Sequence, residues 1–136
     1  MKKLLLVLLL IIGCNSNSNL TLEQRFSNIE NDREQRGELI NGIISELKNR
    51  FELPMDMGVG ISMVDIINEQ DRHFVYVYEV EPNNTTINYI TKTSLISDMR
   101  AANGFEFAKP NGIIMVWRYY SANEKIKEII VEPFEM

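Results

Sequence analysis

The chain has 136 residues, with 14 Lys or Arg against 19 Asp or Glu, and its formal net charge is −5. This acidic balance argues against nucleic acid or an anionic lipid surface as the main partner, because both repel negative charge. The chain holds one cysteine, Cys14. A single cysteine excludes an internal disulfide, zinc sites built on several cysteines, and iron–sulfur clusters.

The first 14 residues carry the clearest pattern. Lys2 and Lys3 precede an unbroken apolar run over residues 4–12, which Gly13 and Cys14 follow. Such a run suits the centre of a signal peptide, whereas a membrane-spanning helix needs about 20 apolar residues. The segment resembles the signal peptide and lipobox of bacterial lipoproteins. The resemblance implies cleavage before Cys14, a diacylglycerol thioether on its sulfur and acylation, as with palmitate, of the new amino terminus. An ordinary secretory signal with a chance cysteine is the alternative.

This reading divides the chain into three parts: a cleaved signal peptide at residues 1–13, lipidated Cys14 with a polar tether to residue 20, and one domain at residues 21–136. Removing Lys2 and Lys3 leaves 12 basic against 19 acidic residues, a net charge of −7. Two acyl chains are enough for stable membrane attachment. In a host with two membranes, Asn15 rather than aspartate after the cysteine favours the outer membrane.

The residues after the tether predict helices and hairpins in alternation. Thr21 and Gln24 are typical of a helix start, and that helix should run to about Arg50. Its second half has apolar residues at helical spacing: Leu39, Ile40, Ile43, Ile44, Leu47 and Phe51. Residues 57–67 and 72–81 predict two strands of a hairpin.

A second helix is expected within residues 87–103, ended by Gly104, and residues 113–120 and 125–131 predict a second hairpin. The order is therefore helix, hairpin, helix, hairpin. We expect an α+β fold with a four-stranded, mainly antiparallel sheet packed against helices. Because a strand's side chains alternate between two faces, Phe74, Tyr76, Tyr78 and Val80 should share one of them.

Aromatic residues gather on two predicted strands. Trp117 and Tyr119 share a strand face, as Tyr76 and Tyr78 do. If these faces align, the sheet carries an aromatic platform. The platform is either core beneath the long helix or a binding surface, since tyrosine and tryptophan are common at interfaces. Tyr76, Tyr78, Trp117 and Tyr119 are thus the candidate binding residues.

The sequence offers little catalytic chemistry. His73 is the only histidine, at a predicted strand start, and Gly58-Val59-Gly60 lacks the third glycine and lysine of phosphate-binding loops. No Gly-x-Ser-x-Gly or His-Glu-x-x-His motif occurs. Five acids surround the first hairpin and form either a solvated rim or a carboxylate site: Asp65, Glu69, Asp71, Glu79 and Glu81. We expect no catalytic residue, metal or cofactor.

The leading hypothesis is therefore a non-catalytic, membrane-anchored lipoprotein of the cell envelope that binds a protein partner. Some pilotins, which assist secretion systems, are small lipoproteins of mixed helix and sheet, and the domain order is similar to theirs. The alternative is a small-ligand-binding, inhibitor or immunity lipoprotein, which predicts a concave aromatic pocket. A hydrolase is a third hypothesis and predicts converging carboxyl groups.

Overall fold

The computed structural model describes residues 33–101 and 105–136. It contains the helices α3 (Arg33–Arg50) and α4 (Lys92–Ala101) and five strands. The strands are β1 (Met55–Asp56), β2 (Ile61–Glu69), β3 (His73–Val80), β4 (Ile114–Ser121) and β5 (Glu124–Val131). Short 3-10 helices lie at Thr86–Tyr89 and Pro133–Glu135. The α+β class and both hairpins are as predicted.

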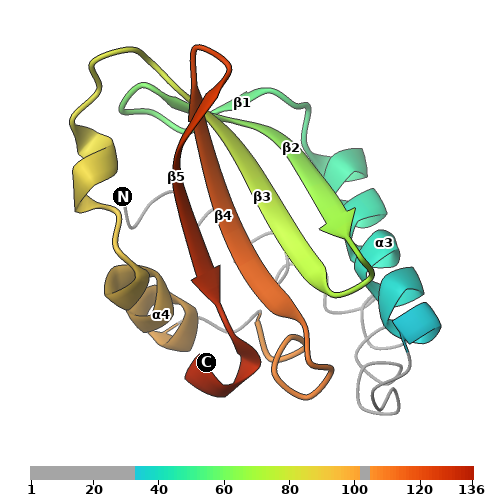
Figure 1. Ribbon diagram of the computed structural model, residues 1–136. Coiled ribbons are helices and arrows are strands. Elements are labelled where there is room, and N and C mark those ends of the chain that lie inside the picture. The colour runs from blue at the N-terminus through green and yellow to red at the C-terminus, as the bar shows by residue number, and fades with distance from the viewer. Residues whose placement is uncertain (1–32, 102–104) are drawn as a thin grey trace.

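The sheet differs from the prediction in the number of its strands and in one parallel pairing. It has five strands in the order β1-β2-β3-β4-β5 (Figure 1). β3 and β4 run parallel, while the other neighbours are antiparallel. The expected number of four strands is therefore wrong, and the mainly antiparallel sheet includes one parallel pair. α4 lies in the connection from β3 to β4, and such a crossover is what lets adjacent strands run parallel.

β1 is the strand that the sequence missed. It pairs with the first residues of β2 through Met55 and Met63. The predicted strand over residues 57–67 runs straight through the turn between them, where Gly58, Val59 and Gly60 all have positive φ. An extended strand cannot contain three left-handed residues, so the segment divides into a loop and β2.

Both helices pack on the same face of the sheet, as the simplest architecture predicted. α3 lies against β2 and α4 against β5 (Figure 1). The core contains the alternate residues of β3 predicted to share a face, together with the apolar side of α3. On the opposite face Val75, Ile114 and Val116 form a smaller buried cluster. Thr21, Gln24 and Gly104 lie outside the described residues.

The first turns of α3 are fixed to the β2–β3 turn. The guanidinium of Arg36 donates from Nε to the carbonyl oxygen of Asp71 at 2.8 Å. Gly37 is buried, and a Cβ at this position would overlap the carboxylate of Asp71. Gln70 and Asp71 both have positive φ, as hairpin turns of the primed types require. α3 therefore approaches the hairpin closely because residue 37 lacks a side chain.

Candidate functional site

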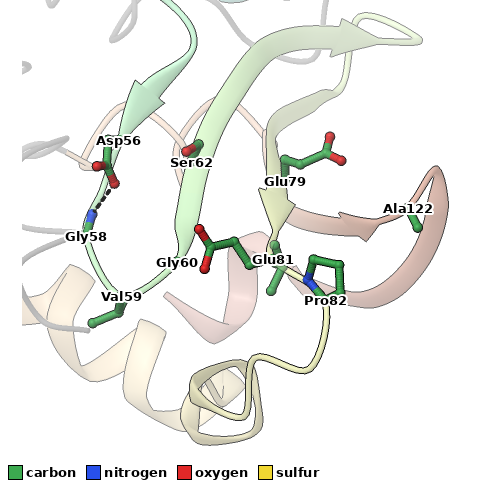
Figure 2. Close-up of a pocket in the computed structure, with 10 residues that line it drawn as sticks. Asp56, Gly58, Val59, Gly60, Ser62, Glu79, Glu81, Pro82 and Ala122 are labelled. Carbon is green, nitrogen blue, oxygen red and sulfur yellow. Dashed lines mark hydrogen bonds between the residues drawn. The ribbon is translucent and has the colours of Figure 1, made fainter.

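A groove with a cavity volume of about 520 Å³ lies at the end of the sheet where β2 begins and β3 ends (Figure 2). One wall is the β1–β2 loop with Gly58, Val59 and Gly60. The opposite wall comes from the end of β3 and the residues after it, and Ala122 of the β4–β5 turn completes the lining. Segments distant in the sequence thus build one concave surface.

Hydrogen bonds hold the β1–β2 loop in its shape. The amide of Gly58 donates to Asp56 Oδ1 at 2.8 Å, the contact drawn in Figure 2. Asn84 Nδ2 donates to the carbonyl oxygen of Val59 at 2.6 Å. The amide of Glu81 donates to the carbonyl of Gly60 at 2.9 Å. The loop is therefore fastened to the segment that follows β3.

Two glycines and one valine give this loop its conformation. Gly58, Val59 and Gly60 have φ values of 77°, 54° and 74°. A β-branched residue with positive φ is a conformational outlier. Val59 is also 53% exposed, which is high for an aliphatic residue. The fold thus presents an isolated aliphatic side chain at the rim of the groove.

Three carboxylates give the groove its charge. Asp56, Glu79 and Glu81 line it together with Ser62. Within residues 33–101 and 105–136, none of these three acids forms an ion pair. Figure 2 shows the Glu81 carboxylate directed towards the side of Gly60. The lining of the groove, as far as the described residues go, is therefore acidic and includes no lysine or arginine.

The five acids singled out in the sequence separate into two kinds. Glu79 and Glu81 belong to the groove. The others have structural partners: Asp65 pairs with Lys48 at 2.8 Å, and Asp71 accepts from Asn68 at 3.0 Å. Glu69 pairs with Arg118. In the part of the chain that the structure describes, no three potential ligands gather around a metal position.

Arg118 joins three strands on the sheet face opposite the helices. Its guanidinium donates to both oxygens of Glu69 on β2, at 2.5 and 3.0 Å, and to Glu128 on β5 at 2.6 Å. Hydrogen bonding from Arg118 lowers the pKa of Glu69. The hydrogen bond with Glu69 is also the main cause that raises the pKa of Arg118. The arrangement is a cross-strand clamp.

The candidate aromatic residues lie in the core and form no open platform. Tyr76, Tyr78, Trp117 and Tyr119 are at most 3% exposed. The two predicted faces do align: Tyr76 is opposite Trp117, and Tyr78 is stacked on Tyr119 with ring centroids 4.8 Å apart. Because both helices pack on this face, these four side chains belong to the core. The candidate binding surface that they were expected to form is not exposed.

His73, Gly58 and Gly60 occupy positions that are explained by the fold itself. His73 Nδ1 lies 3.2 Å from the carbonyl oxygen of Glu69, across the hairpin. Gly58 and Gly60 shape the groove wall. Sequence reasoning missed Asp56, Asn84 and Arg118. The only available signal for Asn84 was its place in a polar turn after a strand, where asparagine side chains often bond the backbone.

The chain was compared with known proteins. No protein-family model and no curated protein matches it. Its fold is similar to the crystal structure of a candidate secreted protein from Pseudomonas aeruginosa, with a TM-score of 0.67 and 9% sequence identity. The match covers 78% of this chain and 96% of that one. At this identity the similarity shows the fold alone. None of the helices in the described ranges combines the length and apolar character that crossing a bilayer requires.

Proposed function

We propose that the chain is an exported bacterial lipoprotein, anchored through Cys14, that acts as a non-catalytic binding module in the cell envelope. The observation that carries this proposal is the apolar run at residues 4–12 leading to Gly13 and Cys14. The name of the Pseudomonas aeruginosa protein, which is described as secreted, is compatible with export. Asn15 favours the outer membrane, and a pilotin-like assembly role is one form of this function.

The groove is the surface through which such a module would engage a protein partner. Its three carboxylates, which form no ion pair among the described residues, complement a lysine or arginine. Such charge complementarity promotes encounter and selects partners. Val59 supplies an exposed aliphatic contact beside them. The hydrogen bonds from Asn84 and to Asp56 fix the loop before binding, which reduces the ordering cost of association.

The anchor is tested by metabolic labelling with an alkynyl palmitate analogue. The wild-type protein should incorporate the label, fractionate with membranes and have the mass of a chain beginning at residue 14. Cys14→Ser should lose the label and leave the membrane fraction. An unlabelled wild-type protein, or equal membrane association of both proteins, would contradict the anchor. Density-gradient separation of the membranes then tests the outer-membrane location.

The partner surface is tested separately, by a photoreactive benzoylphenylalanine in place of Val59 in the lipidated protein. The matched control places the same residue at Tyr89, which is 69% exposed and does not line the groove. We expect one stoichiometric adduct from position 59 and none from position 89. Glu79→Gln with Glu81→Gln should abolish it, while Glu38→Gln with Glu52→Gln should not. Adducts from both positions, or indifference to the groove acids, would refute this surface.

A further inference from the structure

The two edges of the sheet differ in length. One edge is β1, which has two residues, and the other is β5, which has eight (Figure 1). Among the described residues, the backbone of β5 makes no hydrogen bond to the backbone of any segment except β4. The outward N–H and C=O groups of such an edge strand are a template for pairing with a further strand. β5 offers these groups over about 26 Å.

Most of β5 lacks the features that protect an edge strand. Proteins prevent unwanted pairing with proline, with lysine on the edge, or with a bulge. β5 contains no proline, and the Lys127 ammonium donates to the carbonyl oxygen of Ile87 at 2.9 Å, within its own chain. The bulge lies near the start of the strand, opposite Tyr119 and Tyr120, and residues 127–131 pair regularly with β4. This part of the edge therefore keeps the geometry that another strand requires.

Two exposed isoleucines lie on this edge strand. Ile126 is 45% exposed and Ile130 is 40% exposed. Ile130 is opposite Val116, which belongs to the small buried cluster on the sheet face without helices. Alternation along the strand places Ile126 on the same face. The isoleucines therefore continue the buried cluster to the edge of the sheet, where they remain exposed in a single copy of the chain.

The sequence of β5 is complementary to itself in an antiparallel pairing centred on Glu128. Such a pairing places Ile126 of each copy opposite Ile130 of the other, on one face of the joined sheet. Each Glu128 brings its own counter-charges, because it accepts from Arg118 Nε at 2.6 Å and lies 3.7 Å from Lys125 Nζ. The strand has two lysines and two glutamates, so it is neutral in a chain of net charge −5. Two copies can therefore approach at β5 with little repulsion.

We propose that β5 pairs antiparallel with β5 of a second copy of this chain and joins two five-stranded sheets into one of ten strands. The two-fold axis passes beside Glu128, and a two-fold contact is complete with two copies, so the product is a dimer. The helices of both copies lie on the same side of the joined sheet. The contact uses no residue that lines the groove and does not depend on the lipid on Cys14. A strand of a different protein is the competing occupant.

Cysteine pairing tests the register of the two strands. A tagged Ile126→Cys chain is coexpressed with an untagged Ile130→Cys chain, and intact cells are oxidised with copper phenanthroline. Opposed residues have Cα atoms about 4.5–5.5 Å apart, which a disulfide can bridge. We expect a tagged–untagged dimer on a non-reducing gel. Either variant alone should give none, because its two cysteines would be about 13 Å apart, and the wild-type chain controls for Cys14.

The mass of the full-length protein tests the dimer itself. Native mass spectrometry from detergent should give the wild-type protein twice the mass of one chain. Ile126→Lys with Ile130→Lys opposes like charges across the two-fold axis and should give monomers, whereas Ile126→Val with Ile130→Val should remain dimeric. Circular dichroism checks that both variants fold. A monomeric wild-type protein, a dimer that survives the lysine substitutions, a disulfide formed equally by either cysteine alone, or a different protein trapped at these positions would overturn the proposal.

Discussion

Gly60→Ala is expected to destabilise the domain more than Gly58→Ala, although the two glycines have nearly the same backbone conformation. Their φ values are 74° and 77°. A left-handed alanine costs about 1–2 kcal/mol in either place. A Cβ on Gly58 would meet no atom within 4 Å, whereas a Cβ on Gly60 would lie 2.6 Å from Asn84 Nδ2 and 2.8 Å from Glu81 Oε2. Only Gly60→Ala therefore displaces the Asn84–Val59 hydrogen bond.

That bond contributes about 0.5–1.5 kcal/mol. We therefore expect a loss of unfolding free energy of about 1–2 kcal/mol for Gly58→Ala and about 1.5–3.5 kcal/mol for Gly60→Ala. Urea unfolding followed by Trp117 fluorescence measures both, provided that the m-value does not change. Asn84→Ala combined with Gly60→Ala should lose less than the sum of the single effects, because both remove the same bond. Equal losses at the two glycines, or full additivity with Asn84→Ala, would refute the described loop.

Three further changes test other parts of the fold. Gly37→Ala should destabilise the domain despite the better helix propensity of alanine, about 1 kcal/mol, because the new methyl group meets Asp71. Asp71→Gly in the same chain removes the carboxylate and tolerates the positive φ of this position, so it should recover part of the lost stability in urea unfolding. Arg118→Met should change the pH dependence of the urea midpoint. The pKa of Glu69 is lowered from 4.5 in the folded protein, so the ionised Glu69 stabilises the fold above that pH and this contribution is lost as the pH falls through the folded pKa. The urea midpoint of the wild-type protein should therefore fall more steeply than that of Arg118→Met between pH 5 and 3. Parallel profiles of the two proteins would contradict the clamp. Lys48→Met should cost less than about 1 kcal/mol, because its ion pair with Asp65 is exposed, and a larger loss of unfolding free energy would show that this pair fixes α3 on the sheet.

Local patterns predicted the elements of this fold well. The spacing of the apolar residues in α3 and the alternation along β3 each correspond to one buried face. The β4–β5 turn was also predictable, and Ala122 and Asn123 adopt the left-handed pair that tight hairpins need. These features depend on neighbouring residues in the chain, so one sequence contains enough information to recognise them.

Non-local pairing was not predictable in the same way. The parallel contact between β3 and β4 joins strands separated by α4, and nothing in either strand specifies that neighbour. The order hairpin, helix, hairpin does contain a usable signal, because a helical crossover between adjacent strands implies parallel pairing. The groove is harder still, since its walls come from three separate segments. The burial of Tyr76 and Trp117 depended on which sheet face the helices would cover.

The positions of the groove and of the chain's entry into the domain bear on how an anchored protein would work. Residues leading from Cys14 enter the described fold at Arg33, whose Nε lies 3.8 Å from Asp71 Oδ2 at the β2–β3 turn. β2 begins beside the groove and ends at this turn, and its nine residues span about 30 Å. The groove and the entry point are therefore at opposite ends of the sheet. That separation exceeds the screening length of about 8–10 Å, so a domain held at its Arg33 end would present its acidic groove to a partner while anionic headgroups exert little repulsion on it.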